Sequence, residues 1–264
     1  MAGRSSVASP RKAARIQGAT AARFVDVLSD RQRSATDRRK GERTRDRLKL
    51  AAVQSLDQRG YLQLRVADIC KKAKVAHSVF YIYFKNKEEI TVEVLTEFLT
   101  HTFQLDTTPT DRHPRSLYYG LLRINLRWIR AIRANSGLTR CLLQLADQVP
   151  EFKELNSRMN HEWFMRVCDR MIKRFPAAKI DKSTLLLAVF ALGGMIDEFC
   201  SKLLVTEEEH LVDLVRRTAP TDEALAEVLS TIWYRGLFAI DPPLHKHKAG
   251  LALRALSGLP ATAG

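Results

Sequence analysis

Residues 60–89 of the chain read GYLQLRVADICKKAKVAHSVFYIYFKNKEE. Two short segments with helical spacing stand side by side here, and the few residues between them leave room only for a tight turn. The first, Val66–Ala73, places its apolar residues on one face, whereas the second, about His77–Phe84, mixes aromatic rings with hydrogen-bonding groups. Lysines surround both segments. This pattern predicts a helix-turn-helix that enters a groove of DNA.

The charge distribution supports a polyanionic partner. Residues 1–90 contain 21 Lys and Arg against 9 Asp and Glu, whereas residues 91–264 contain 22 against 20. Nearly all of the net charge of +14 therefore lies in the first third of the chain. Such an asymmetry is typical of a protein that binds a polyanion. For residues 1–40 taken alone, a solvated basic tail explains the charge equally well.

Size and apolar patterning indicate a protein that works in the cytoplasm. The chain has 264 residues, of which 45% are hydrophobic, and this is enough for a substantial core. Its four cysteines form no CxxC pair, as expected of core thiols in a reducing compartment. The longest apolar run, Leu185–Ile196, is shorter than the roughly 20 residues of a membrane span. We therefore expect a soluble, cytoplasmic protein without a membrane partner.

The whole chain is predicted to be all-α, because no segment alternates with a period of two. We expect a disordered basic arm over residues 1–41 and a helix-turn-helix domain over 42–88. A larger helical domain would follow over 89–240, and a flexible tail over 241–264. Asn86 with Glu89 three residues later predicts a capped helix start at the junction between the two domains.

An ordered set of short motifs carries a family resemblance. They are Arg59-Gly60-Tyr61, Val66-Ala67-Asp68-Ile69, Ala73-Lys74-Val75-Ala76 and the run Phe80–Glu88. With these motifs, the segment from about Arg45 to Val94 resembles the DNA-binding domain of the TetR/AcrR family of bacterial transcription regulators. The rest of the chain is similar to the family only in length and helical pattern. The resemblance implies an N-terminal three-helix domain, followed by a larger bundle for ligand binding and dimerisation.

The resemblance also implies which side chains contact DNA: Arg45, Arg47, His77, Ser78, Tyr81, Tyr83 and Lys87. His77 and Ser78, at the start of the recognition helix, would face base edges, and the other five would contact phosphates. Ordinary packing is the alternative for the two tyrosines.

Four positions depart from the family pattern. The family usually has a Ser or Thr cap where Leu64 or Arg65 stands, glycine at Lys74, a cap at Ala76 and a hydroxyl at Val79. A missing cap costs about 0.5–2 kcal/mol. These departures concern the turn and the individual base contacts more than the fold.

The resemblance implies a ligand pocket and a dimer interface in the second domain. Six residues are candidates for lining an apolar pocket, with ordinary core packing as the alternative: Trp128, Leu142, Trp163, Val167, Met171 and Phe190. The effector would be a small apolar or amphipathic molecule. The segments Ser183–Leu204 and Thr221–Ala239 are the candidates for a homodimer interface. Gly193-Gly194 within the first indicates either close helix packing or a kink that lines a pocket.

The sequence thus predicts a dimeric regulator that binds double-stranded DNA at a palindromic operator, most simply a repressor released by its ligand. No metal-ligand cluster, phosphate-binding glycine loop or nucleophile motif is evident, so we expect no metal, no cofactor and no enzyme activity. The alternative is a helical adaptor whose basic N-terminal region binds acidic partners or an anionic membrane surface.

Overall fold

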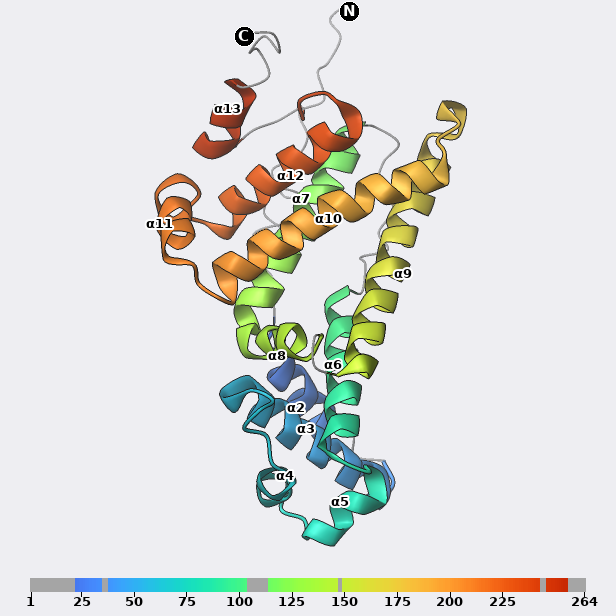
Figure 1. Cartoon of the computed structure of the whole chain (residues 1–264), viewed down its shortest axis with the longest axis vertical. Helices are drawn as coiled ribbons and strands as arrows, with labels where there is room; N and C mark the ends of the chain where they lie inside the picture. Colours follow the sequence, from blue (N-terminus) through green and yellow to red (C-terminus); the bar gives the residue numbers. More distant parts are fainter. Residues whose placement is uncertain (1–21, 35–37, 104–113, 147–148, 243–245, 256–264) are drawn as a thin grey trace, which may run out of the picture.

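The computed structural model describes residues 22–34, 38–103, 114–146, 149–242 and 246–255. Within these ranges all regular structure is helical, which confirms the all-α prediction. The molecule is elongated, and two short helices, α4 and α5, lie at one end of its long axis (Figure 1).

Five helices make up the end of the molecule that carries α4 and α5: α2 (Phe24–Ser34), α3 (Lys40–Arg59), α4 (Val66–Ala73), α5 (His77–Tyr83) and α6 (Lys87–Phe103). Gly60 ends α3 with a φ of 77°, and its N–H donates to the Leu56 carbonyl at 2.9 Å. Asn86 caps α6, because its side-chain oxygen accepts the Glu89 N–H at 2.8 Å. The predicted cap at Asn86 is confirmed.

The rest of the chain forms a larger helical bundle: α7 (Pro114–Ala134), α8 (Ser136–Ala146), α9 (Pro150–Arg174), the 3-10 turn η1 (Pro176–Ala178), α10 (Lys182–Leu204), α11 (Glu209–Thr218), α12 (Asp222–Phe238) and α13 (Lys248–Ala255). Asp181 caps α10 by accepting the Thr184 N–H at 2.7 Å, and Thr221 caps α12 by accepting the Ala224 N–H at 3.1 Å. Polar side chains thus cap these two helix starts.

Two apolar cores fill the molecule. One joins α2–α6 to α8 and the beginning of α9, and the other lies among α7, the rest of α9, α10, α11 and α12. The first core therefore extends past the domain boundary expected at residue 88. Gly137 of α8 shows how tight this joint is, since a Cβ there would lie 2.2 Å from the Asp57 carbonyl oxygen of α3.

The expectation of a disordered arm over 1–41 is wrong for residues 24–34, which form α2. Phe24 is fully buried, its ring lies 5.5 Å from that of Phe98, and its N–H donates to the Asn135 side chain at 2.7 Å. Arg23 adds an ion pair to Asp57 at 2.6 Å. These contacts, together with the buried Leu28, hold the apolar side of α2 against the first core. Residues 1–21 lie outside the described part.

The expectation of a flexible tail over 241–264 is wrong for the segment around α13. The buried Glu227 carboxylate of α12 accepts the N–H groups of Lys246 and His247 at 3.0 Å. Arg235 pairs with Asp241 and donates to the Leu253 carbonyl at 2.8 Å. Backbone donors at the start of a helix favour a carboxylate, so Glu227 anchors α13. Residues 243–245 and 256–264 lie outside the described part.

One helix among the described residues, α10, is long and apolar enough to cross a membrane by length and composition alone. Core helices pass the same criterion, so this finding carries little weight.

Candidate DNA-binding surface

The helix α5 lies at the end of the molecule and is attached to the first core by two aromatic side chains. Phe80 and Phe84 are buried, with ring centroids 5.7 Å apart, and they hold one face of α5 against the first core. The opposite face, which includes His77, Ser78 and Tyr81, is exposed to solvent. The two phenylalanines thus have the core role expected of them, and the predicted base-contacting residues are free to meet a ligand.

The turn between α4 and α5 contains a strained lysine. Lys74 has a φ of 53° and a ψ of 51°, a left-handed conformation that costs a non-glycine residue about 1–2 kcal/mol. The Arg47 guanidinium compensates by donating to the carbonyl oxygens of Ala73 and Lys74, the latter at 2.8 Å. Arg47 therefore acts inside the domain, where it holds the end of α4.

Arg45 is also occupied within the chain. It donates to both carboxylate oxygens of Glu93 on α6, with one contact of 2.6 Å, and its guanidinium lies 5.0 Å from the centre of the Phe84 ring. The prediction that Arg45 and Arg47 contact phosphates is at odds with this geometry. Both lie beyond the first turn of α3, because that helix begins at Lys40, two residues earlier than the sequence pattern indicates.

The cations that α3 does present are Arg39, Lys40 and Arg43, which are exposed at its first turn. Tyr83 links this turn to α5, since its hydroxyl lies 3.5 Å from where a Gly41 Cβ would be. The dense Arg and Lys run over residues 38–47 is the sequence signal for this cluster. Periodicity alone could not tell which members of the run lie at the helix start.

The remaining predicted phosphate contacts lie near α5. Lys87 is at the first position of α6, with its ammonium 4.5 Å from the centre of the Tyr61 ring. The Tyr61 hydroxyl donates to Glu88 at 2.7 Å, and burial together with this carboxylate raises the Tyr61 pKa. Tyr81 is exposed, and its ring packs edge-on against His77 at 5.3 Å. The structure thus groups His77, Ser78, Tyr81, Tyr83 and Lys87 at one end of the molecule.

The family model for bacterial regulatory proteins of the TetR family matches residues 50–94, which run from within α3 through α4 and α5 into α6. Residues 50–94 thus match the DNA-binding segment of TetR-family regulators. Among curated proteins, an uncharacterized HTH-type transcriptional regulator of Bacillus subtilis, YdgC, is 41% identical over 59 residues, which are 22% of this chain and 30% of that protein. The fatty acid metabolism regulator protein of the same organism is 45% identical over 47 residues, 18% of this chain and 24% of its own length. These matches thus span less than a third of either curated relative.

Solved structures extend the likeness to the whole fold. The fatty acid degradation regulator FadR from Bacillus halodurans superposes with a TM-score of 0.53 at 20% identity, covering 74% of this chain and 96% of that one. A TetR-family transcriptional regulator from Streptomyces coelicolor gives 0.54 at 16% identity, over 81% of this chain and 96% of its own. At such low identity the likeness shows a shared fold. It confirms the arrangement of a helix-turn-helix followed by a larger helical bundle in this chain.

Five of the six residues predicted to line a ligand pocket lie at or beside the second core, and Leu142 lies apart from them. Trp128, Trp163, Val167 and Met171 pack in or against the second core, whereas Leu142 packs against the first. Phe190 is partly exposed on α10, where its ring lies 4.6 Å from that of Phe164. Sequence periodicity identified apolar helix faces without showing which of the two cores each one joins.

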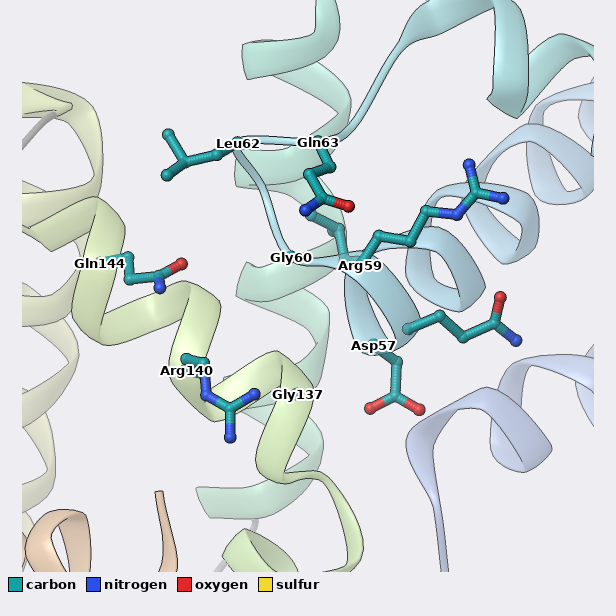
Figure 2. Close-up of a pocket in the computed structure, with 10 residues that line it drawn as sticks. Asp57, Arg59, Gly60, Leu62, Gln63, Gly137, Arg140 and Gln144 are labelled. Carbon is teal, nitrogen blue, oxygen red and sulfur yellow. The ribbon is translucent and has the colours of Figure 1, made fainter. Parts of the chain in front are cut away.

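A polar cavity of about 230 Å³ lies where the helix-turn-helix unit meets α8. Gln144 points toward Gly60 across it, while Arg59 extends away (Figure 2). Its lining consists of Leu56, Asp57, Gln58, Arg59, Gly60, Leu62, Gln63, Gly137, Arg140 and Gln144. Arg140 donates to the Val205 carbonyl at 3.2 Å, so it also ties this joint to the end of α10.

The two helices predicted to form a dimer interface differ in exposure. On α10, Leu187, Phe190 and Met195 are exposed, with Leu187 at 73%. On α12 most side chains are buried among α7, α10 and α13, and Glu227 is one of them. Gly193 of α10 packs against Phe164, since a Cβ there would lie 2.3 Å from that ring, which supports the close-packing interpretation of Gly193-Gly194.

Proposed function

We propose that this TetR-family chain is a sequence-specific transcriptional repressor that binds a palindromic operator as a homodimer and is released by a small ligand. The observation that carries the proposal is the exposed polar face of α5, which projects from one end of a basic domain of this family. A helix of seven residues is about 10.5 Å long and fits a major groove about 12 Å wide.

The proposed DNA contacts fall into two groups. His77 and Ser78 face base edges from the start of α5, while Tyr81, Tyr83 and Lys87 meet phosphates. A second phosphate cluster lies at the first turn of α3, where Arg39, Lys40 and Arg43 take the place of the internally paired Arg45 and Arg47. These lysines and arginines give the binding its salt dependence, because each phosphate contact releases counterions.

The dimer is proposed to form through the exposed apolar face of α10. Leu187, Phe190 and Met195 would be buried against a second copy, with Gly194 allowing close approach. Two copies of α5 separated by one DNA turn, about 34 Å, then fit the two half-sites of a palindrome. Because α12 is largely covered by its own chain, its share of the interface would be smaller than the sequence indicates.

The helix α6 is the proposed connection between ligand and DNA. Near its start Glu93 pairs with Arg45 and Lys49 of α3, and near its end the His101 carbonyl accepts from Arg127 of α7. A ligand that favours another position of α7 or α9 would therefore move α6 and change the spacing of the two α5 helices. This requires different affinities for the two states. Two similar proteins are fatty acid regulators by name, which supports an amphipathic effector with an acyl chain.

The test is operator selection from a random duplex pool, followed by binding measurements at several salt concentrations. The double variant Tyr81→Phe with Lys87→Ala should weaken binding to the selected duplex and flatten its salt dependence. Lys173→Ala, which removes an exposed lysine at the far end of α9, should leave both unchanged. Unchanged binding by the double variant would contradict the assigned phosphate contacts. Preference for anionic vesicles over DNA at matched salt would favour the adaptor alternative.

A further inference from the structure

One apolar side chain stands out on the exposed face of α5. Ile82 is 75% exposed, although the two residues that anchor the same helix, Phe80 and Phe84, are fully or nearly fully buried. It stands four residues after Ser78 and therefore lies on the same face of the helix. An isoleucine left in water forgoes the free energy of burial, which contact with an apolar ligand group would recover.

The surroundings of Ile82 are polar and cationic. Ser78 precedes it by one helical turn, the exposed Lys85 and Asn86 follow it, and the exposed His77–Tyr81 pair lies on the adjacent face. A second copy of the chain would bring the same lysine and the same polar groups against each other, so this face is unsuited to self-association. A nucleic acid groove instead matches a lysine, hydrogen-bonding groups and a single apolar residue.

We propose that Ile82 contacts the C5-methyl group of a thymine in each operator half-site. This inference rests on the proposed function and deepens it by naming a base. Among the edges that base pairs present in the major groove, the thymine methyl is the apolar one. A β-branched side chain in a helix is held in one strongly preferred rotamer, so Ile82 presents its methyl groups with little further loss of freedom. Ser78 and His77 would then select the neighbouring bases by hydrogen bonds.

Removing the methyl group from the DNA tests the contact directly. Each thymine of the selected operator is replaced, one position at a time, by deoxyuridine, which keeps the base pairing and lacks the methyl. Dissociation constants are measured by fluorescence anisotropy for the parent protein and for Ile82→Ala. The matched control is Leu62→Ala, because Leu62 is 69% exposed on the same domain but lies in the turn that faces α8.

For the parent protein, one thymine per half-site should be sensitive, with binding weakened roughly threefold to fivefold by deoxyuridine. Ile82→Ala should bind the thymine and deoxyuridine duplexes equally, and Leu62→Ala should respond as the parent does. If no thymine is sensitive, or if Ile82→Ala keeps the full sensitivity, the inference is overturned while the proposed function stands. If the parent protein selects no duplex, the proposed function falls and the inference with it.

Discussion

At the scale of single residues, the turn between α4 and α5 departs from the pattern expected of the TetR family. Lys74 occupies a left-handed position that favours glycine, and Arg47 donates to the carbonyl oxygens of Ala73 and Lys74. Lys74 therefore adds positive charge and backbone strain together, and the hydrogen bonds from Arg47 offset part of that strain. Substitutions at Lys74 and at Arg47 test the strain and the hydrogen bonds separately.

Lys74→Gly should raise the free energy of unfolding by roughly 1 kcal/mol, because glycine adopts the left-handed conformation without strain. Urea titration measures the change. Lys71→Gly removes the same charge from inside α4, where glycine costs about 1 kcal/mol, and should have the opposite sign. If both variants lose stability, the strain at Lys74 is not significant.

Arg47→Ala should lower the free energy of unfolding by about 1.5–3 kcal/mol through the loss of charge-assisted hydrogen bonds. Its DNA binding should weaken by the same factor at every salt concentration, because Arg47 contacts the turn and not a phosphate. If the variant's DNA affinity depended less steeply on salt concentration than the parent's, Arg47 would contact a phosphate, as the family resemblance implies.

At the scale of elements, α2 is an addition ahead of the segment that matches the family. It touches α3 through Arg23 and Asp57, α6 through Phe24 and Phe98, and the corner between α7 and α8 through Asn135. A single short helix thus joins the helix-turn-helix unit to the bundle. Much of that connection depends on one buried ring.

Phe24→Ala should cost about 3–5 kcal/mol, since it leaves a cavity beside Phe98 in the first core. Arg33→Ala, on the exposed side of α2 and paired only with nearby Asp30, should change stability by less than about 0.5 kcal/mol. Urea unfolding of both variants measures the difference. Equal, small effects would show that α2 adds little to the fold.

At the scale of the whole molecule, an acidic group stands on α10 beside the second core. Asp197 is exposed at the surface of α10, yet the neighbouring chain surrounds its carboxyl group closely, and this desolvation raises its pKa to about 7 while a hydrogen bond from Trp128 lowers it. The folded state then holds the proton more tightly than the unfolded state does, so the stability that this group contributes is lost as the pH rises from about 4 through 7.

Asp197→Asn should therefore reduce the fall in melting temperature between pH 4 and pH 8, by roughly 2–4 °C for each kcal/mol recovered. Glu198→Gln removes a neighbouring exposed charge, which pairs with Lys202, and serves as the control. Thermal unfolding followed by circular dichroism at the two pH values gives the comparison. An unchanged pH profile in Asp197→Asn would assign the dependence to other groups.

Much of the fold follows from local signals in the sequence. Glycine at Gly60, the cap at Asn86 and the caps at Asp181 and Thr221 predict helix ends that the structure confirms. Local signals are weaker for α2 and α13, which are short helices held by contacts with distant residues such as Asn135 and Glu227.

The DNA-binding surface shows the same division. The order of residues from Val66 to Lys87 determines a helix-turn-helix, since the apolar spacing, the tight turn and the cap all act within a few residues. Tertiary structure alone decided that Arg45 and Arg47 face inward to Glu93 and the turn, and that Ile82 faces outward. Periodicity places a side chain on a helix face, but the partner of that face comes from elements far away in the chain.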